Sequence, residues 1–139
     1  MVRLDYGFFH RPCLTVAEEL VGKCLVRRLP SGEVLRLRIS ETEAYCGEAD
    51  TASHAHKGRT KRTEVLYAEA GTIYVYLCYG IHWLLNIVTG EFNRRHICRQ
   101  EELYIEDDGF RCEITTDKRV GIGYASQEDQ DKLWRFKMT

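Results

Sequence analysis

Alternating apolar and polar positions predict a series of short strands joined by turns, preceded by one short helix. The helix is expected over residues 14–21, where Thr15 and Glu18 have the spacing of a capping box and Gly22 supplies a stop signal. Strand-like segments are predicted at residues 23–29, 34–45, 72–78, 81–89, 103–105, 119–123 and 134–136. Hairpin connections dominate and no alternation of strand and helix is visible, so the pattern predicts a single α+β domain with mainly antiparallel sheet.

The segment at residues 34–45 carries the first indication of chemistry. Leu35, Leu37 and Ile39 share one face of the predicted strand, and the same alternation places Glu41 and Glu43 at the end of that apolar face. A carboxylate there is costly to bury unless a partner compensates its charge. The position therefore indicates either a structural ion pair or a functional site. The pattern alone does not choose between these interpretations or between the two glutamates.

The predicted hairpin at residues 72–89 is rich in tyrosine. Tyr74 and Tyr76 share one face, apolar residues occupy the other, and Tyr79 lies at the tip in a turn with Gly80. An ordinary hairpin whose tyrosines pack their rings and expose their hydroxyls would have this pattern. A hairpin that carries an exposed aromatic wedge beside an aromatic pocket would have it as well.

The composition fits a single folded domain. The chain has 139 residues, of which 44% are hydrophobic and 29% charged, and its formal net charge is −1. No apolar window approaches the length of a membrane span and no signal-peptide core is recognisable, so no membrane association is expected. Lys57, Arg59, Lys61 and Arg62 nevertheless place four positive charges within six residues. This basic loop is either a solvated surface loop or a phosphate-binding patch.

Six cysteines occur, at positions 13, 24, 46, 78, 98 and 112. With no Cys-x-x-Cys pair and no secretion signal, free thiols in a reducing compartment are the expected state. Cys46, His54 and His56 are close in sequence but lack the usual zinc spacing, so a metal-dependent hydrolase is the weakest alternative function. The sequence contains no glycine-rich nucleotide loop, nucleophile elbow or metalloprotease motif, so no cofactor is expected.

The remaining features fit the needs of an enzyme that flips a base out of DNA. Such an enzyme holds phosphates, fills the space left in the base stack, encloses the extruded base between aromatic rings and places a carboxylate near the sugar carbon. The groups available for these four tasks are, in the same order, the basic loop, Tyr79, the rings of Tyr45, His54 and Tyr76, and Glu43.

Several motifs then resemble, in order and spacing, the alkylpurine DNA glycosylases of base-excision repair, also called methylpurine or 3-methyladenine DNA glycosylases. The matching segments lie at residues 8–9, 20–23, 25–27, 41–45, 52–54, 60–63, 74–80, 85–88, 119–122 and 134–136. The strongest match is Tyr-Val-Tyr-Leu-Cys-Tyr-Gly at residues 74–80. The resemblance implies a curved antiparallel sheet with a protruding hairpin and few short helices.

The resemblance also implies a role for each candidate residue. Glu43 would be the general base that deprotonates water for attack on C1′ of a flipped nucleotide. Tyr45 and His54 would form one wall of the base pocket, and Tyr76 the facing wall. The other implied residues are Ala52 and Asn86 in the base pocket, Tyr79, Ile81 and His82 in the intercalating group, and Lys57, Arg59, Lys61 and Arg62 on the DNA backbone.

The family further implies the reaction and the partner. The expected substrates are alkylated or deaminated purines, such as 3-methyladenine, hypoxanthine and ethenoadenine, in double-stranded DNA. Water would release them, with no cofactor and no strand cleavage. A monomer in the cytoplasm is expected, at the nucleoid of a prokaryote or in the nucleus of a eukaryote.

The sequence departs from the family after residue 90. The Leu-x-Arg-Ala-x-Glu-Pro-like strand and the Gly-Pro-Gly-Lys-Leu region of family members are missing, so residues 1–139 are expected to form one shortened domain. Arg94, Arg95 and Arg99 lie beside this gap, and none aligns with the active-site arginine of the missing strand. The alternative function is therefore a DNA-binding remnant that keeps the hairpin and the basic loop but does not catalyse.

Overall fold

The computed structural model describes residues 1–90 and 102–139, so Arg94, Arg95, Cys98 and Arg99 lie outside the described residues. The strands are β1 Val2–Arg3, β2 Cys24–Arg28, β3 Val34–Arg38, β4 Glu41–Glu43, β5 Ile73–Cys78, β6 His82–Ile87, β7 Leu103–Asp107, β8 Ile114–Asp117 and β9 Arg135–Met138. The helices are α1 Tyr6–Phe9, α2 Cys13–Leu20 and α3 Gln127–Asp131, with 3-10 turns η1 Gly47–Ala49, η2 His54–Lys57 and η3 Glu64–Tyr67.

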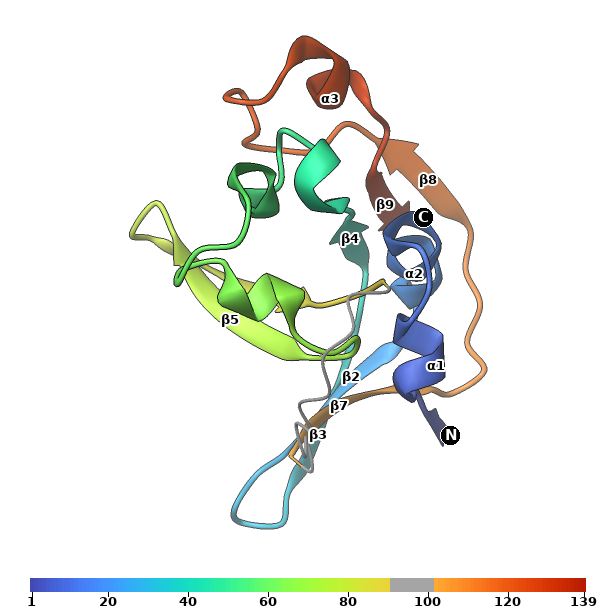
Figure 1. The fold of residues 1–139 in the computed structure, drawn as a ribbon. Coiled ribbons are helices and arrows are strands. Elements are labelled where there is room, and N and C mark those ends of the chain that lie inside the picture. The colour runs from blue at the N-terminus through green and yellow to red at the C-terminus, as the bar shows by residue number, and fades with distance from the viewer. Residues whose placement is uncertain (91–101) are drawn as a thin grey trace.

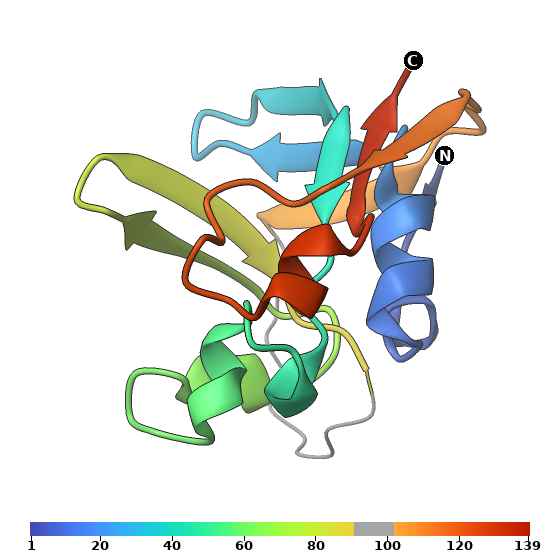
Figure 2. The ribbon, with the colours of Figure 1, turned by 90° about the horizontal axis from the view of Figure 1, so that it is seen from above.

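These strands form three sheets with the orders β1-β7-β2-β3, β4-β9-β8 and β5-β6. Every pair of neighbouring strands is antiparallel, which confirms the predicted α+β class with mainly antiparallel sheet. The β5–β6 hairpin extends from the body of the molecule with its tip directed away from α1 and α2 (Figures 1 and 2). Among the described residues, no helix combines the length and the apolar character needed to cross a membrane.

Helix α2 connects the two larger sheets because its residues enter two different apolar clusters. Val16 and Leu20 pack in one cluster with Ile105 of β7, in the four-stranded sheet. Ala17 packs in the other cluster with Phe136 of β9, in the three-stranded sheet. The helix thereby fixes the two sheets relative to each other.

The predicted position of helix α2 is confirmed, but its predicted cap is wrong. Pro12 occupies the N-cap position, without a side-chain hydrogen bond, while Thr15 and Glu18 lie inside the helix. Proline has no N–H to satisfy and its ring fixes φ, so the helix begins directly after it, earlier than a capping box at Thr15 would place it.

The single strand predicted over residues 34–45 is divided between two sheets. Ile39 N donates to Lys23 O of the four-stranded sheet at 2.9 Å, whereas Ser40 O accepts from Met138 N of the three-stranded sheet at 2.8 Å. The alternation of faces therefore does not continue from β3 into β4. Leu35 and Leu37 are 40% and 61% exposed, so the part of the predicted apolar face that lies in β3 is at the surface, whereas Ile39 packs against an apolar cluster.

The strand predicted at residues 119–123 is wrong, because this segment is a loop that follows β8. Arg119 is buried in an ion pair and Gly121 has a positive φ of 72°, neither of which suits a continuing strand. Strand β8 and helix α3 were not predicted. Strand β7 extends to Asp107, two residues beyond the segment predicted at residues 103–105.

The expectation of free thiols is wrong for two cysteines. Cys13 and Cys46 form a disulfide whose Cα atoms are 6.1 Å apart, because the start of α2 lies beside the segment that follows β4. Cys24, Cys78 and Cys112 are free. Since Cys46 is bonded to Cys13, it is not available as a metal ligand beside His54 and His56. No group of metal-ligating side chains occurs in the part of the chain that the structure describes, and the metal-dependent hydrolase is not supported.

Candidate active site

Glu43 stands at the end of β4, held by two neutral donors. The Tyr45 hydroxyl donates to Oε2 at 2.6 Å, and the Val120 backbone N–H donates to Oε1 at 2.9 Å. The Arg135 guanidinium is farther away, with its Nε 4.0 Å from Oε1, and the Glu43 side chain is 21% exposed. Each carboxylate oxygen has two acceptor sites, so both oxygens can still accept a hydrogen bond from a water molecule.

Tyr45 combines a hydrogen-bonding role with a ring available for stacking. Burial raises the pKa of Tyr45, and its hydrogen bond to Glu43 raises it further. The phenol therefore stays protonated near neutral pH and remains a donor to the carboxylate. Its ring lies 4.9 Å from the guanidinium carbon of Arg119, which is a favourable cation–π distance.

Arg119 is the buried centre of the network behind this site. Its guanidinium forms two hydrogen bonds to Asp50, at 2.6 and 3.0 Å, and also donates to Ala44 O and Asp129 O. The two charged side chains are almost completely buried. Asp50 in turn accepts backbone N–H groups from residues 46 and 52, so one ion pair fixes the loop that carries Tyr45. The sequence analysis did not predict the pairing of Asp50 with Arg119, because the two residues lie in distant segments of the chain.

His54 and Tyr76 form an edge-to-face pair. Their ring centroids are 5.2 Å apart with an interplanar angle of 77°, and the Tyr76 hydroxyl is 3.5 Å from Nε2 of His54. The two rings are in direct contact in this structure, and the assignment of Tyr76 to a wall facing Tyr45 and His54 stays a prediction. Burial, with a smaller effect from Arg62, lowers the pKa of His54, so its ring is neutral at pH 7.

Asn86 and Ala52 complete the predicted base pocket. Asn86 lies opposite Tyr74 in the β5–β6 register, which puts it on the same face of the hairpin as Tyr76. Its amide nitrogen donates to Leu84 O at 3.1 Å, which leaves the amide oxygen as an acceptor. Ala52 is buried, and its carbonyl accepts the Tyr124 hydroxyl at 2.7 Å.

The tip of the hairpin exposes the predicted intercalating group. Tyr79 is 71% exposed and Ile81 73% exposed, and His82 is also exposed. Tyr79 has a positive φ of 51° and Gly80 one of 71°, as the central residues of the tight turn closed by the Ile81 N–H to Cys78 O require. Its hydroxyl donates to Gly121 O at 3.1 Å, next to the Val120 N–H that binds Glu43. The hairpin tip and the catalytic candidate therefore meet at one loop.

The basic loop lies next to His54, within and after η2. All four of its cationic side chains are exposed, but Arg59 is paired with Glu64 and lies over the Tyr67 ring at 5.5 Å. Lys57, Lys61 and Arg62 form no ion pair among the described residues. Three of the four expected backbone contacts are thus available to an anion without breaking an existing pair.

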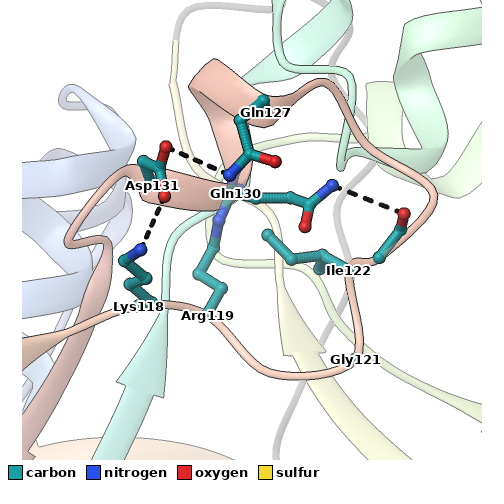
Figure 3. Close-up of a pocket in the computed structure, with 8 residues that line it drawn as sticks. Lys118, Arg119, Gly121, Ile122, Gln127, Gln130 and Asp131 are labelled. Carbon is teal, nitrogen blue, oxygen red and sulfur yellow. Dashed lines mark hydrogen bonds and ion pairs between the residues drawn. The ribbon is translucent and has the colours of Figure 1, made fainter.

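A polar pocket of about 280 Å³ lies between residues 118–123 and helix α3 (Figure 3). Its lining includes the ion pair of Lys118 with Asp131 and the amides of Gln127 and Gln130. None of the predicted site residues lines this pocket. One of its walls is the loop at residues 118–123, which also carries the Val120 N–H that binds Glu43.

Comparisons with a family model and with individual relatives point to the same protein family. Residues 7–95 match the sequence pattern of the methylpurine-DNA glycosylase family. Three relatives bear the name "Putative 3-methyladenine DNA glycosylase". The protein of Natranaerobius thermophilus is 50% identical over 94 residues, which are 67% of this chain and 47% of that protein. That of Methanocella arvoryzae is 56% identical over 86 residues, 62% of this chain and 42% of that protein.

The third relative, from Borrelia garinii subsp. bavariensis, is 32% identical over 176 residues, covering 96% of this chain and 94% of that protein. By contrast, the chain spans about half the length of the first two relatives. The alignment with the Borrelia protein is longer than the 139 residues of this chain, so that relative has residues without a counterpart here. This difference agrees with the internal gap expected from the sequence.

Proposed function

Because the chain belongs to the methylpurine-DNA glycosylase family, we propose that it hydrolyses the N-glycosidic bond of damaged purines in double-stranded DNA. The substrates are alkylated or deaminated purines of the 3-methyladenine, hypoxanthine and ethenoadenine type. The reaction releases the free base and leaves an abasic sugar in an unbroken strand.

The observation that carries this proposal is the environment of Glu43. Its carboxylate is held by the Tyr45 hydroxyl and the Val120 N–H, and each oxygen keeps an acceptor site. Glu43 acts as the general base that orients a water molecule and takes its proton during attack on C1′. Such a base contributes about 10²–10⁴-fold to a rate.

The aromatic rings supply the binding energy for the flipped base. An alkylated purine is electron-poor or cationic, so it stacks favourably on electron-rich rings. The base enters between Tyr45 on one side and the His54–Tyr76 pair, whose two rings are in direct contact, on the other. Asn86 offers its amide oxygen to the purine edge, and Ala52 limits the depth of the pocket.

The partner is duplex DNA, bound by the hairpin tip and the basic loop. Tyr79 fills the vacated position in the base stack, with Ile81 and His82 beside it. Lys57, Lys61 and Arg62 contact phosphates, and Arg59 joins them only if its pair with Glu64 opens. Water is the nucleophile, so the chain acts without a cofactor, a Schiff-base lysine or strand cleavage, and it acts as a monomer.

A second candidate function is recognition of damaged DNA without catalysis. It is favoured by the residues that the Borrelia relative has and this chain lacks. In this case the rings and the hairpin would still bind a flipped base, while the missing segment would be required for release.

A single-turnover assay on a duplex with one hypoxanthine separates these functions. We expect the chain to release hypoxanthine, and Glu43→Gln to lower the rate by about 10²–10⁴-fold while retaining affinity for the duplex. Glu19→Gln is the matched control, because Glu19 pairs with Arg11 on the exposed side of α2, away from the site. Binding without release from hypoxanthine and ethenoadenine duplexes would support the second function instead.

A further inference from the structure

One face of the three-stranded sheet carries five charged side chains, of which Glu43 is one. The central strand β9 contributes Arg135 and Lys137, while the outer strands contribute Glu41 and Glu43 from β4 and Asp117 from β8. Lys137 pairs with Asp117 at 2.8 Å, and Arg135 pairs with Glu41. Two cations thus face three carboxylates, and Glu43 is the carboxylate without a full partner.

The register would allow Arg135 to pair with Glu43 directly. These two residues are opposite each other in the β4–β9 ladder, and the flanking hydrogen bond runs from Ala44 N to Trp134 O. Glu43 and Arg135 therefore form a non-hydrogen-bonded pair, the type whose side chains lie closest.

Arg135 nevertheless directs its hydrogen bonds to Glu41. Its Nε and one terminal nitrogen bind the two Glu41 oxygens at 2.6 and 3.0 Å, whereas Nε is 4.0 Å from Glu43. Arg135 and Glu43 are both about one-fifth exposed, so the charge of Arg135 is only partly screened where it faces Glu43.

We propose that Glu41 and Arg135 are positioning residues for Glu43: Glu41 holds the guanidinium at a distance where it stabilises the negative charge of Glu43 without occupying its oxygens. This inference rests on the proposed glycosylase function. A direct two-pronged ion pair would take the acceptor sites needed for water, and without a nearby cation the partly buried negative charge would lose a favourable electrostatic interaction.

Arg135 is the group that can stabilise the negative charge of Glu43, because the other groups facing Glu43 are neutral or already paired. The Tyr45 hydroxyl and the Val120 N–H are neutral donors, and Asp117 is bound by Lys137. Among the described residues, Arg135 is the cationic side chain that contacts Glu43 within 4.0 Å. Its removal should therefore change the acid side of the pH–rate profile, which a purely structural ion pair would leave in place.

The test measures the single-turnover release of hypoxanthine from pH 5 to pH 9 with the full chain. For Arg135→Gln we expect the pH of half-maximal rate on the acid side to rise by about one pH unit, with unchanged affinity for the duplex at pH 8. Arg135→Lys, which keeps the charge, should retain the acid-side midpoint of the unsubstituted chain even where its maximal rate is lower.

Glu41→Gln should act in the opposite direction. It frees Arg135 to approach Glu43, so the maximal rate should fall and the acid-side midpoint should move to lower pH. The matched control is Arg38→Gln, because Arg38 forms an equally direct pair with Asp108, at 2.8 and 2.7 Å, in the other large sheet. Thermal unfolding of Arg135→Gln and Arg38→Gln shows whether their losses of stability are equivalent.

The outcomes separate this inference from the proposed function. Release by the unsubstituted chain, with profiles for Arg135→Gln and Arg38→Gln that coincide, would overturn the positioning role alone. A Glu41→Gln midpoint that moves upward, as for Arg135→Gln, would overturn the anchoring role of Glu41. Failure of the unsubstituted chain to release any base would overturn the proposed function and, with it, this inference.

Discussion

The loop that carries Tyr45 and the hairpin that carries Tyr79 differ in how they are held. The loop is fixed from behind by the buried pair of Asp50 with Arg119, whose guanidinium also lies 4.9 Å from the Tyr45 and Trp134 rings. The hairpin is a two-stranded sheet, an arrangement that is at best marginally stable by itself. The loop that carries Tyr45 is thus fixed by buried contacts of the fold, whereas the hairpin has little support from its own small sheet.

The exposed surface of the hairpin sharpens this difference. Val75, Leu77, Trp83 and Leu85 share the face opposite Tyr76, and all four are substantially exposed, Trp83 to 72%. Solvent therefore contacts large apolar side chains, which are normally buried in a core or an interface. The network behind Tyr45 is therefore buried and polar, whereas this face of the hairpin is exposed and apolar.

The largest effect on stability is expected when the buried pair of Asp50 with Arg119 is broken. Asp50→Ala leaves the buried Arg119 charge unpaired, which should lower the free energy of unfolding by about 3–5 kcal/mol. Denaturant unfolding measures this change. Glu19→Ala removes an exposed partner of Arg11 and should cost at most about 1 kcal/mol. Equal losses in the two variants would contradict the anchoring role of the buried pair.

An intermediate effect is expected at the hairpin tip. Tyr79→Ala should weaken binding to a hypoxanthine duplex by about 1–3 kcal/mol, because a stacking aromatic side chain is lost, and should leave unfolding nearly unchanged. Fluorescence anisotropy gives the affinity. Tyr6→Ala, at an exposed tyrosine that stacks on His10 in α1, is the control and should bind normally. Unchanged affinity of Tyr79→Ala would remove Tyr79 from the intercalating group.

The smallest effect on DNA binding is expected from the basic loop. Replacing Lys57, Lys61 and Arg62 together by alanine should reduce the slope of log affinity against log salt by about 3, since roughly one counterion is released for each phosphate contact. A matched triple variant at Arg27, Arg28 and Arg36 removes the same charge from β2 and β3 and should keep the slope. Equal slopes would identify the basic loop as an ordinary solvated surface.

Local patterns predicted the parts of the fold that depend on neighbouring residues. Helix α2 and the hairpin with Tyr79 at its tip lie where the sequence placed them. The division of residues 34–45 was not predictable, because Ser40 is paired with Met138 near the other end of the chain. A one-strand pattern cannot reveal a change of sheet that a distant strand imposes.

The polar network behind the site was missed for the same reason. Asp50 and Arg119 are far apart in sequence, and each resembles an ordinary surface charge until the fold brings them together. The disulfide between Cys13 and Cys46 likewise depends on where α2 packs beside β4. The roles of the site residues in DNA binding and catalysis remain predictions.

The most direct test of the proposed function is product analysis with excess protein on a duplex that contains one isotopically labelled hypoxanthine. Free hypoxanthine should appear by mass spectrometry in an amount equal to alkali-labile sites in otherwise unbroken strands. Both products should be lost in Glu43→Gln, which still binds the duplex. The account would be contradicted by a bound duplex that yields no free base, or by undiminished release from Glu43→Gln.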